Sequence, residues 1–130
     1  MDNEAIQKLK MIFEKIFEVK LVYFFGSRAR GDDGPLSDYD FAFYFDESDS
    51  VKLFDLKLKL MDEISRLLKT DKVDVVILNI TENPELKYQI IKEGKLIYEQ
   101  EPFKVVIEPK ILNEYFDFRY FLLKYNLTKA

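Results

Sequence analysis

Apolar residues recur along this chain in two patterns, a helical period and short continuous runs. Spacings of three and four residues predict amphipathic helices over residues 3–17 and 51–69. Runs rich in β-branched and aromatic residues predict strands, and a shorter run predicts an edge strand; in chain order these are 19–25, 39–45, 73–78 and 95–99. Helices and strands therefore alternate along most of the chain.

The last third of the chain has a mixed pattern. Pro84 suits a first helical residue and predicts a helix over 84–93. The segment 103–107 fits either a strand or a helical turn before Pro109, and 111–125 fits a helix. Aromatic residues lie on more than one side of that last helix, so we expect part of it to dock on something outside its own core.

Composition limits both size and chemistry. The 130 residues, 48% of them hydrophobic, suit one domain spanning 1–130. The chain has no cysteine and no histidine, which excludes disulfides, thiolate sites and Ser-His-Asp catalysis. Carboxylates remain as metal ligands, and they favour hard cations such as Mg²⁺. The net charge of -4 argues against a nucleic-acid partner.

The start of the chain carries no targeting pattern. Residues 1–4 are polar and acidic, unlike a signal peptide, and no apolar run approaches the length of a membrane span. We therefore expect a cytoplasmic protein that does not bind a membrane.

Two acidic residues, Asp38 and Asp40, stand at the start of the predicted strand 39–45. Alternate residues of a strand share a face, so the two carboxylates should point the same way, ~6.6 Å apart along the backbone. Like charges this close repel each other, at a cost on the order of 1 kcal/mol in water and more when partly buried. A bound divalent cation would compensate for that repulsion.

A second group of residues is suited to binding phosphate. Gly26 and Ser27 end a predicted strand and precede a possible helical turn, where a hydroxyl and free amides form a phosphate cradle. Asp74, near the start of another strand, could share a metal and accept a proton. Each feature alone has a simpler interpretation, as a turn or as a solvated acid. The hypothesis rests on their combination.

The combined motif, Gly26-Ser27, ten further residues, Asp38-x-Asp40 and the later Asp74, resembles the DNA polymerase β-like nucleotidyltransferase superfamily. Over residues 3–99 it most resembles the minimal nucleotidyltransferases. The resemblance implies an α/β (α+β) fold, with a small mixed sheet flanked by helices and a C-terminal helix.

The resemblance also implies a role for each motif residue. Gly26 and Ser27 would hold the triphosphate of ATP, and Asp38 and Asp40 would ligate two Mg²⁺ ions. Asp74 would be the third metal ligand and would complete the catalytic triad. Two arginines that follow the serine, Arg28 and Arg30, are candidate phosphate contacts because their planar forks match phosphate oxygens. The alternative for either arginine is a solvated side chain on the helical turn. This alternative has more weight for Arg30 than for Arg28.

Minimal nucleotidyltransferases resemble antitoxins that pair with a HEPN-domain ribonuclease toxin encoded by a neighbouring gene. That resemblance implies AMP transfer from ATP to a tyrosine of the toxin, with 103–130 as a helical tail that docks on the partner. Alternatively, the aromatic tail closes the core or forms a homodimer. Three other functions stay open: an antitoxin that acts by contact alone, a transferase acting on a small molecule such as an aminoglycoside, and, least favoured, a polymerase.

Overall fold

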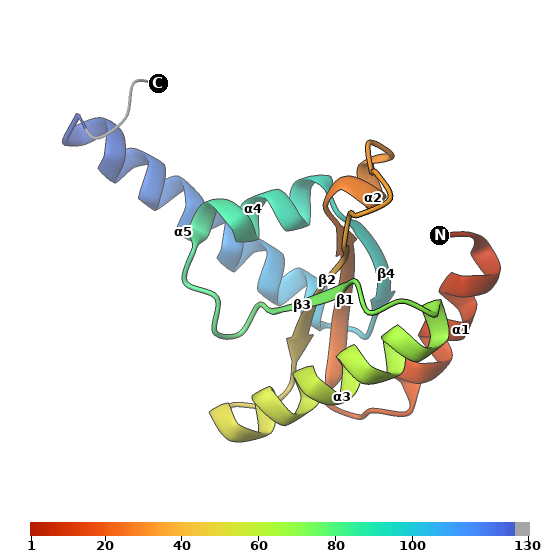
Figure 1. Cartoon of the computed structure of the whole chain (residues 1–130). Helices are drawn as coiled ribbons and strands as arrows, with labels where there is room; N and C mark the ends of the chain where they lie inside the picture. Colours follow the sequence, from red (N-terminus) through yellow and green to blue (C-terminus); the bar gives the residue numbers. More distant parts are fainter. Residues whose placement is uncertain (127–130) are drawn as a thin grey trace.

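The computed structural model describes residues 1–126, so the last four residues of the predicted tail lie outside it. Five helices and four strands alternate in the order α1 (Asn3–Glu14), β1 (Val19–Phe25), α2 (Ser27–Arg30), β2 (Tyr39–Phe45), α3 (Ser50–Leu68), β3 (Val73–Ile77), α4 (Pro84–Glu93), β4 (Lys95–Glu99) and α5 (Phe103–Lys124). The strands form one sheet in the order β3-β2-β1-β4 (Figure 1). β1 is antiparallel to β2 and β4, whereas β2 and β3 are parallel, which confirms the predicted mixed α/β sheet.

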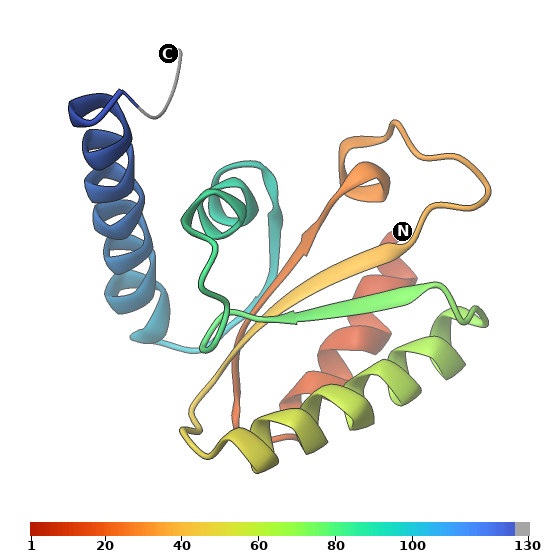
Figure 2. The same ribbon diagram turned by 60° about the vertical axis from the view of Figure 1, so that its left-hand side comes forward.

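Helices cover both faces of this sheet (Figure 2). α1 and α3 pack on one face, where Phe41, Phe43 and Phe45 of β2 join the larger hydrophobic cluster. α4 and α5 pack on the other face, against the second cluster, which contains Ala42. Side chains of β2 therefore alternate between the two clusters, as expected for a strand. The almost continuous burial of β1 follows from its central position and cover on both faces.

The predicted strand limits agree with the structure more closely than the helix limits do. Strands β1, β2 and β4 match their predicted ranges, and β4 is an edge strand as predicted. The predicted helix 3–17 was too long: α1 ends at Glu14, and Phe17, the last apolar residue in the predicted helical spacing, is 73% exposed. The chain turns after Glu14 to enter β1, so the helical spacing of Phe17 was coincidental.

α5 resolves the ambiguity around Pro109. The segment 103–107 is helical and continuous with the rest of α5 (Phe103–Lys124), with Pro109 inside the helix. Ile107 and Ile111 anchor the first half on the sheet, and the Tyr23 hydroxyl donates a hydrogen bond to the Glu108 carboxylate. The second half extends away from the body of the protein (Figures 1 and 2). No helix in residues 1–126, α5 included, is both long enough and apolar enough to cross a bilayer.

Candidate active site

The acidic residues come together through the parallel pairing of β2 and β3. Asp40 is the register partner of Asp74 on the adjacent strand, and Asp38 immediately precedes β2. Phe41 on β2 and Val75 on β3 belong to the cluster under α1 and α3. Alternation therefore turns the carboxylates of Asp40 and Asp74 toward the opposite face of the sheet, which carries α4 and α5, while Asp38 lies just outside β2.

The pKa of Asp40 is sensitive both to burial and to the two neighbouring acids. Its pKa is raised from 3.8 to about 6, first by burial, then by the negative charges of Asp74 and Asp38, while Arg30 acts in the opposite direction. Asp40 is half-buried, whereas Asp38 and Asp74 are exposed. The donors are all oxygen, which fits a hard cation such as Mg²⁺. Within residues 1–126, however, no three acidic side chains converge closely enough to ligate one ion together.

Gly26 lies directly against this acidic group. Its φ of +84° is unfavourable for any residue with a side chain, and a Cβ built at this position would collide with Oδ2 of Asp40 and lie 3.1 Å from its Cγ. The backbone of the turn after β1 is therefore in direct contact with the Asp40 carboxylate, and no side chain fits between them. A glycine is required here by both conformation and space.

Ser27 opens the single turn α2 (Ser27–Arg30). Its carbonyl oxygen accepts hydrogen bonds from the amides of Gly31 (2.9 Å) and Asp32 (3.1 Å), which closes the turn. The buried side chain of Ala29 fixes α2 against the core. The Ser27 hydroxyl makes no hydrogen bond within residues 1–126, so it is available to a ligand at the edge where Gly26 meets Asp40.

The two candidate arginines have different surroundings. Arg28 Nε donates to the carbonyl oxygen of Ser37 (2.9 Å), its Nη1 pairs with Asp33 (3.1 Å), and its guanidinium lies 4.2 Å from the Tyr39 ring centroid. Arg28 therefore holds the 32–38 loop, and through it the position of Asp38. Arg30 is exposed, pairs with Asp32 at 3.3 Å and acts electrostatically on Asp40. Of the two, Arg30 is the freer to meet a phosphate.

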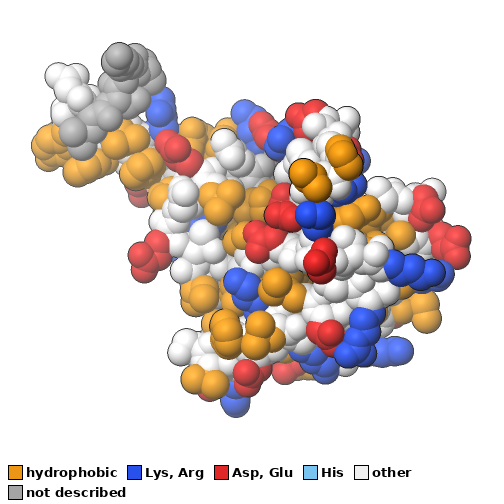
Figure 3. All heavy atoms as spheres, viewed as in Figure 1, with side chains coloured by type: hydrophobic (Ala, Val, Ile, Leu, Met, Phe, Trp, Pro, Cys, Tyr) orange, Lys and Arg blue, Asp and Glu red, His pale blue; other side chains and the backbone are white. Residues whose placement is uncertain are grey.

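A space-filling view shows acidic and basic side chains side by side below the turn α2 (Figure 3). Apolar side chains extend from there along α5. Acidic side chains near α2 and apolar side chains along α5 are thus both exposed on this face of the molecule.

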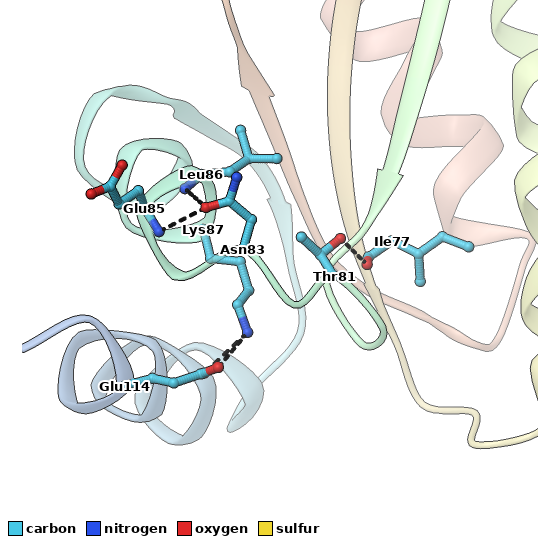
Figure 4. A network of polar contacts seen from close by, with 7 residues as sticks. All are labelled: Ile77, Thr81, Asn83, Glu85, Leu86, Lys87 and Glu114. Carbon is cyan, nitrogen blue, oxygen red and sulfur yellow. Dashed lines mark hydrogen bonds and ion pairs between the residues drawn. The ribbon is translucent and has the colours of Figure 1, made fainter. Parts of the chain in front are cut away.

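Sequence reasoning missed the ion pair between the buried Lys87 of α4 and the exposed Glu114 of α5. Lys87 is 7% exposed, and its Nζ lies 2.9 and 3.0 Å from the two carboxylate oxygens of Glu114 (Figure 4). The Tyr88 ring stacks on Tyr115 with centroids 3.9 Å apart. One signal was present in the sequence, because Lys87 is three residues before the buried Ile90 and so shares its helix face.

Comparison with known proteins places these features in a family. Residues 7–103 match the model of the family described as Polymerase beta, Nucleotidyltransferase. Two candidate protein adenylyltransferases of Methanocaldococcus jannaschii, MJ1379 and MJ0128, are 35% and 38% identical to this chain over 96 and 97 residues. Each alignment covers 74% of this chain and 92% of the relative.

Solved structures share the fold at lower identity. The toxin–antitoxin complex MntA–HpeT superposes with a TM-score of 0.74 at 21% identity, covering 95% of this chain and 94% of the matched one. A tri-AMPylated HEPN toxin of Shewanella oneidensis in complex with its MNT antitoxin gives 0.72 at 19%, with the same coverage. Another toxin–antitoxin structure, solved with AMP-PNP, gives 0.73 at 22%. With the family match over residues 7–103, the chain belongs to the polymerase β nucleotidyltransferase family and is a nucleotidyltransferase.

Proposed function

We propose that this nucleotidyltransferase transfers AMP from ATP to a tyrosine hydroxyl of a partner protein, a HEPN ribonuclease toxin, and so acts as its antitoxin. One observation supports the chemistry most directly: the Gly26 turn lies against Asp40, and Asp40 is the β-sheet register partner of Asp74. A phosphate-binding turn and a carboxylate group thus share one edge. The protein acceptor is supported by the names of the M. jannaschii relatives, and the toxin by the fold shared with MNT antitoxins.

Each residue of the edge has a proposed role. Asp38, Asp40 and Asp74 would hold Mg²⁺, two ions in all, which would neutralise the charge that builds up on the phosphates. Ligation would draw the carboxylates together against their own repulsion. Gly26 and Ser27 would receive the triphosphate of ATP, with backbone amides and the free Ser27 hydroxyl as donors.

Reaction then requires an acceptor hydroxyl in line with the α-phosphorus of ATP. The hydroxyl oxygen forms a bond to that phosphorus, the bond from phosphorus to the bridging oxygen breaks, and pyrophosphate leaves. Asp74 accepts the hydroxyl proton, because its exposed carboxylate lies beside Asp40 at the open edge of the sheet. Arg30 would stabilise negative charge on the phosphates, while Arg28 would keep Asp38 in place.

We also propose that the tail 103–130 of the single domain 1–130 docks on the partner. In the described part of that tail, the second half of α5 exposes Phe116, Tyr120, Phe121 and Leu123, and Tyr125 is exposed just after the helix. Aromatic residues of this kind are enriched in protein interfaces. The anchored first half would then hold the interface in a fixed position relative to the acidic edge.

The test is to mix the protein with ATP, Mg²⁺ and the purified product of the gene next to its own. Intact-mass spectrometry should show adenylate added to that product, and no mass shift would contradict the modification. Asp38→Ala and Asp40→Ala should abolish transfer and retain binding. The exposed half of α5 favours one alternative, an antitoxin that acts by contact alone. If both variants still neutralise the partner fully, that alternative is correct.

A further inference from the structure

A wide-open cavity with a mixed polar and apolar lining lies on the sheet face that carries the acids, at the far end of the strands. Its outer part has a volume of about 710 Å³, and an inner part of about 170 Å³ reaches the sheet at Tyr44 and Leu78. The two parts share four lining residues, Asn79, Lys87, Lys110 and Glu114. The cavity is therefore bounded by the loop after β3, by α4 and by α5.

The position of this cavity relates it to the acids. Tyr44 follows Asp40 by four residues on β2, so both point to the same face. At about 3.3 Å per residue, the cavity begins roughly 13 Å from Asp40. A group bound there would not share the metal site, but a polypeptide segment there could place a neighbouring side chain over the acids.

The charges favour a polypeptide over a second nucleotide. Lys87 is already paired with Glu114, and Glu82 at the rim opposes the charge of Lys110. The lining thus has no net positive charge, which a phosphate site would require. Lys110 itself is exposed and makes no ion pair within residues 1–126, so it offers one cation to a ligand.

The cavity is also continuous with the exposed part of α5. Glu114 lines the cavity, and Phe121, 51% exposed, follows it by two helical turns on the same face of α5. A protein covering that face of the second half of α5 would therefore extend toward the cavity.

We propose that this cavity is the acceptor subsite, which binds a polar segment of the acceptor protein beside the modified hydroxyl, with a carboxylate or amide of that segment facing Lys110. This inference rests on the proposed transfer to a protein and adds where that protein is held. The cavity would act in recognition of the acceptor and would take no part in the chemistry at phosphorus.

The experiment compares Lys110→Glu with Lys104→Glu, a matched charge reversal at another exposed lysine of α5 that does not line the cavity. Transfer rates are measured against the concentration of the neighbouring gene's product and, separately, against ATP. Lys110→Glu should raise KM for the acceptor at least about tenfold and leave kcat and KM for ATP within twofold, while Lys104→Glu should change none of them. Thermal unfolding should be unchanged in both variants because both lysines are exposed.

An unchanged KM for the acceptor would overturn the subsite, and so would an effect confined to KM for ATP. If the wild-type protein transfers nothing, the proposed function fails, and the subsite is then judged by acceptor binding in a calorimetric titration. Equal affinity of Lys110→Glu and wild type in that titration would also overturn it.

Discussion

At the scale of single residues, Gly26 and Asp40 define how close the phosphate-binding turn and the acids can come. The positive φ of Gly26 and its contact with the Asp40 carboxylate are two separate requirements, one on the backbone and one on the space beside it. Gly31 meets only the backbone requirement: its φ is +86°, but a Cβ there would have no heavy atom within 4 Å. This pair allows strain and steric collision to be tested separately.

Gly26→Ala and Gly31→Ala should therefore differ in activity more than in stability. Each should cost about 1–3 kcal/mol in backbone strain. Only Gly26→Ala should displace Asp40, and a displacement of about 1 Å can reduce transfer about 100-fold. Chemical denaturation and initial transfer rates measure the two effects. Equal loss of activity in both variants would show that strain alone disturbs the site.

Asp40 carries a second prediction, in which function and stability oppose each other. Its neighbours Asp74 and Asp38 disfavour its charge, so Asp40→Asn should abolish transfer and raise the melting temperature of the metal-free protein by several degrees, equivalent to about 1 kcal/mol for a partly solvated group. Asp46→Asn, an exposed acid directly after the far end of β2, should change neither property.

The folding stability of the wild type should depend on pH, and the pKa of Asp40 gives the direction of that dependence. Because folding raises the pKa of Asp40 from 3.8 to about 6, the folded state binds the proton more tightly. The wild-type stability gained in this way is fully present below pH 3.8 and is lost as pH rises through about 6. Asp40→Asn should lack this component. The melting temperatures of the wild type and Asp40→Asn are measured between pH 4 and 7.5. The variant should exceed the wild type by an amount that grows with pH.

At the scale of elements, α5 has two halves with different roles. The first part, up to Glu114, is held by Ile107 and Ile111, by Glu108 through Tyr23, and by Glu114 through Lys87. Burial and the bond to Glu108 raise the pKa of the Tyr23 hydroxyl, which therefore stays a neutral donor. The second half contributes little to the core and exposes aromatic rings. This division suits a helix fixed at one end and bound to a partner at the other.

The double variant Phe116→Glu/Tyr120→Glu should weaken partner binding at least about tenfold, or about 1.4 kcal/mol. These side chains are 57% and 66% exposed and distant from the acids, so the affinity for ATP should not change. The Phe116 ring also packs edge-on against Tyr88 and Tyr115, and thermal unfolding checks that the double variant keeps its fold. Val105→Glu, 72% exposed on the anchored half, is the control and should bind normally. Calorimetric titration with the partner measures all three. Retained affinity in the double variant would place the interface elsewhere.

At the scale of the whole molecule, the acidic edge joins segments that are distant in the chain, from β1, β2 and β3. A ligand that bridges them should stabilise the fold as a unit. ATP with Mg²⁺ at about 100 times Kd should add about 2.7 kcal/mol, or roughly 10 °C in melting temperature. Removal of the metal with EDTA should abolish most of the shift. A shift of the same size with ATP in EDTA would contradict a metal-dependent site.

The sequence by itself determined the local features. Hydrophobic period predicted nearly every helix and strand, because burial of one face leaves a repeating pattern in the chain. The absence of histidine and cysteine restricted the chemistry to carboxylates, and the spacing of Asp38 and Asp40 put them on one side of a strand. Local spacing misled only where the chain leaves its element, as at Phe17.

Tertiary structure decided what depends on contacts between distant segments. The parallel register of β2 and β3 put Asp74 beside Asp40, and the turn after β1 put Gly26 against the same carboxylate. Contacts with the 32–38 loop separated the role of Arg28 from that of Arg30. The cavity beside Lys110 exists only because α4 and α5 pack together. A one-dimensional pattern cannot encode these proximities, since each depends on how the whole sheet and its helices pack.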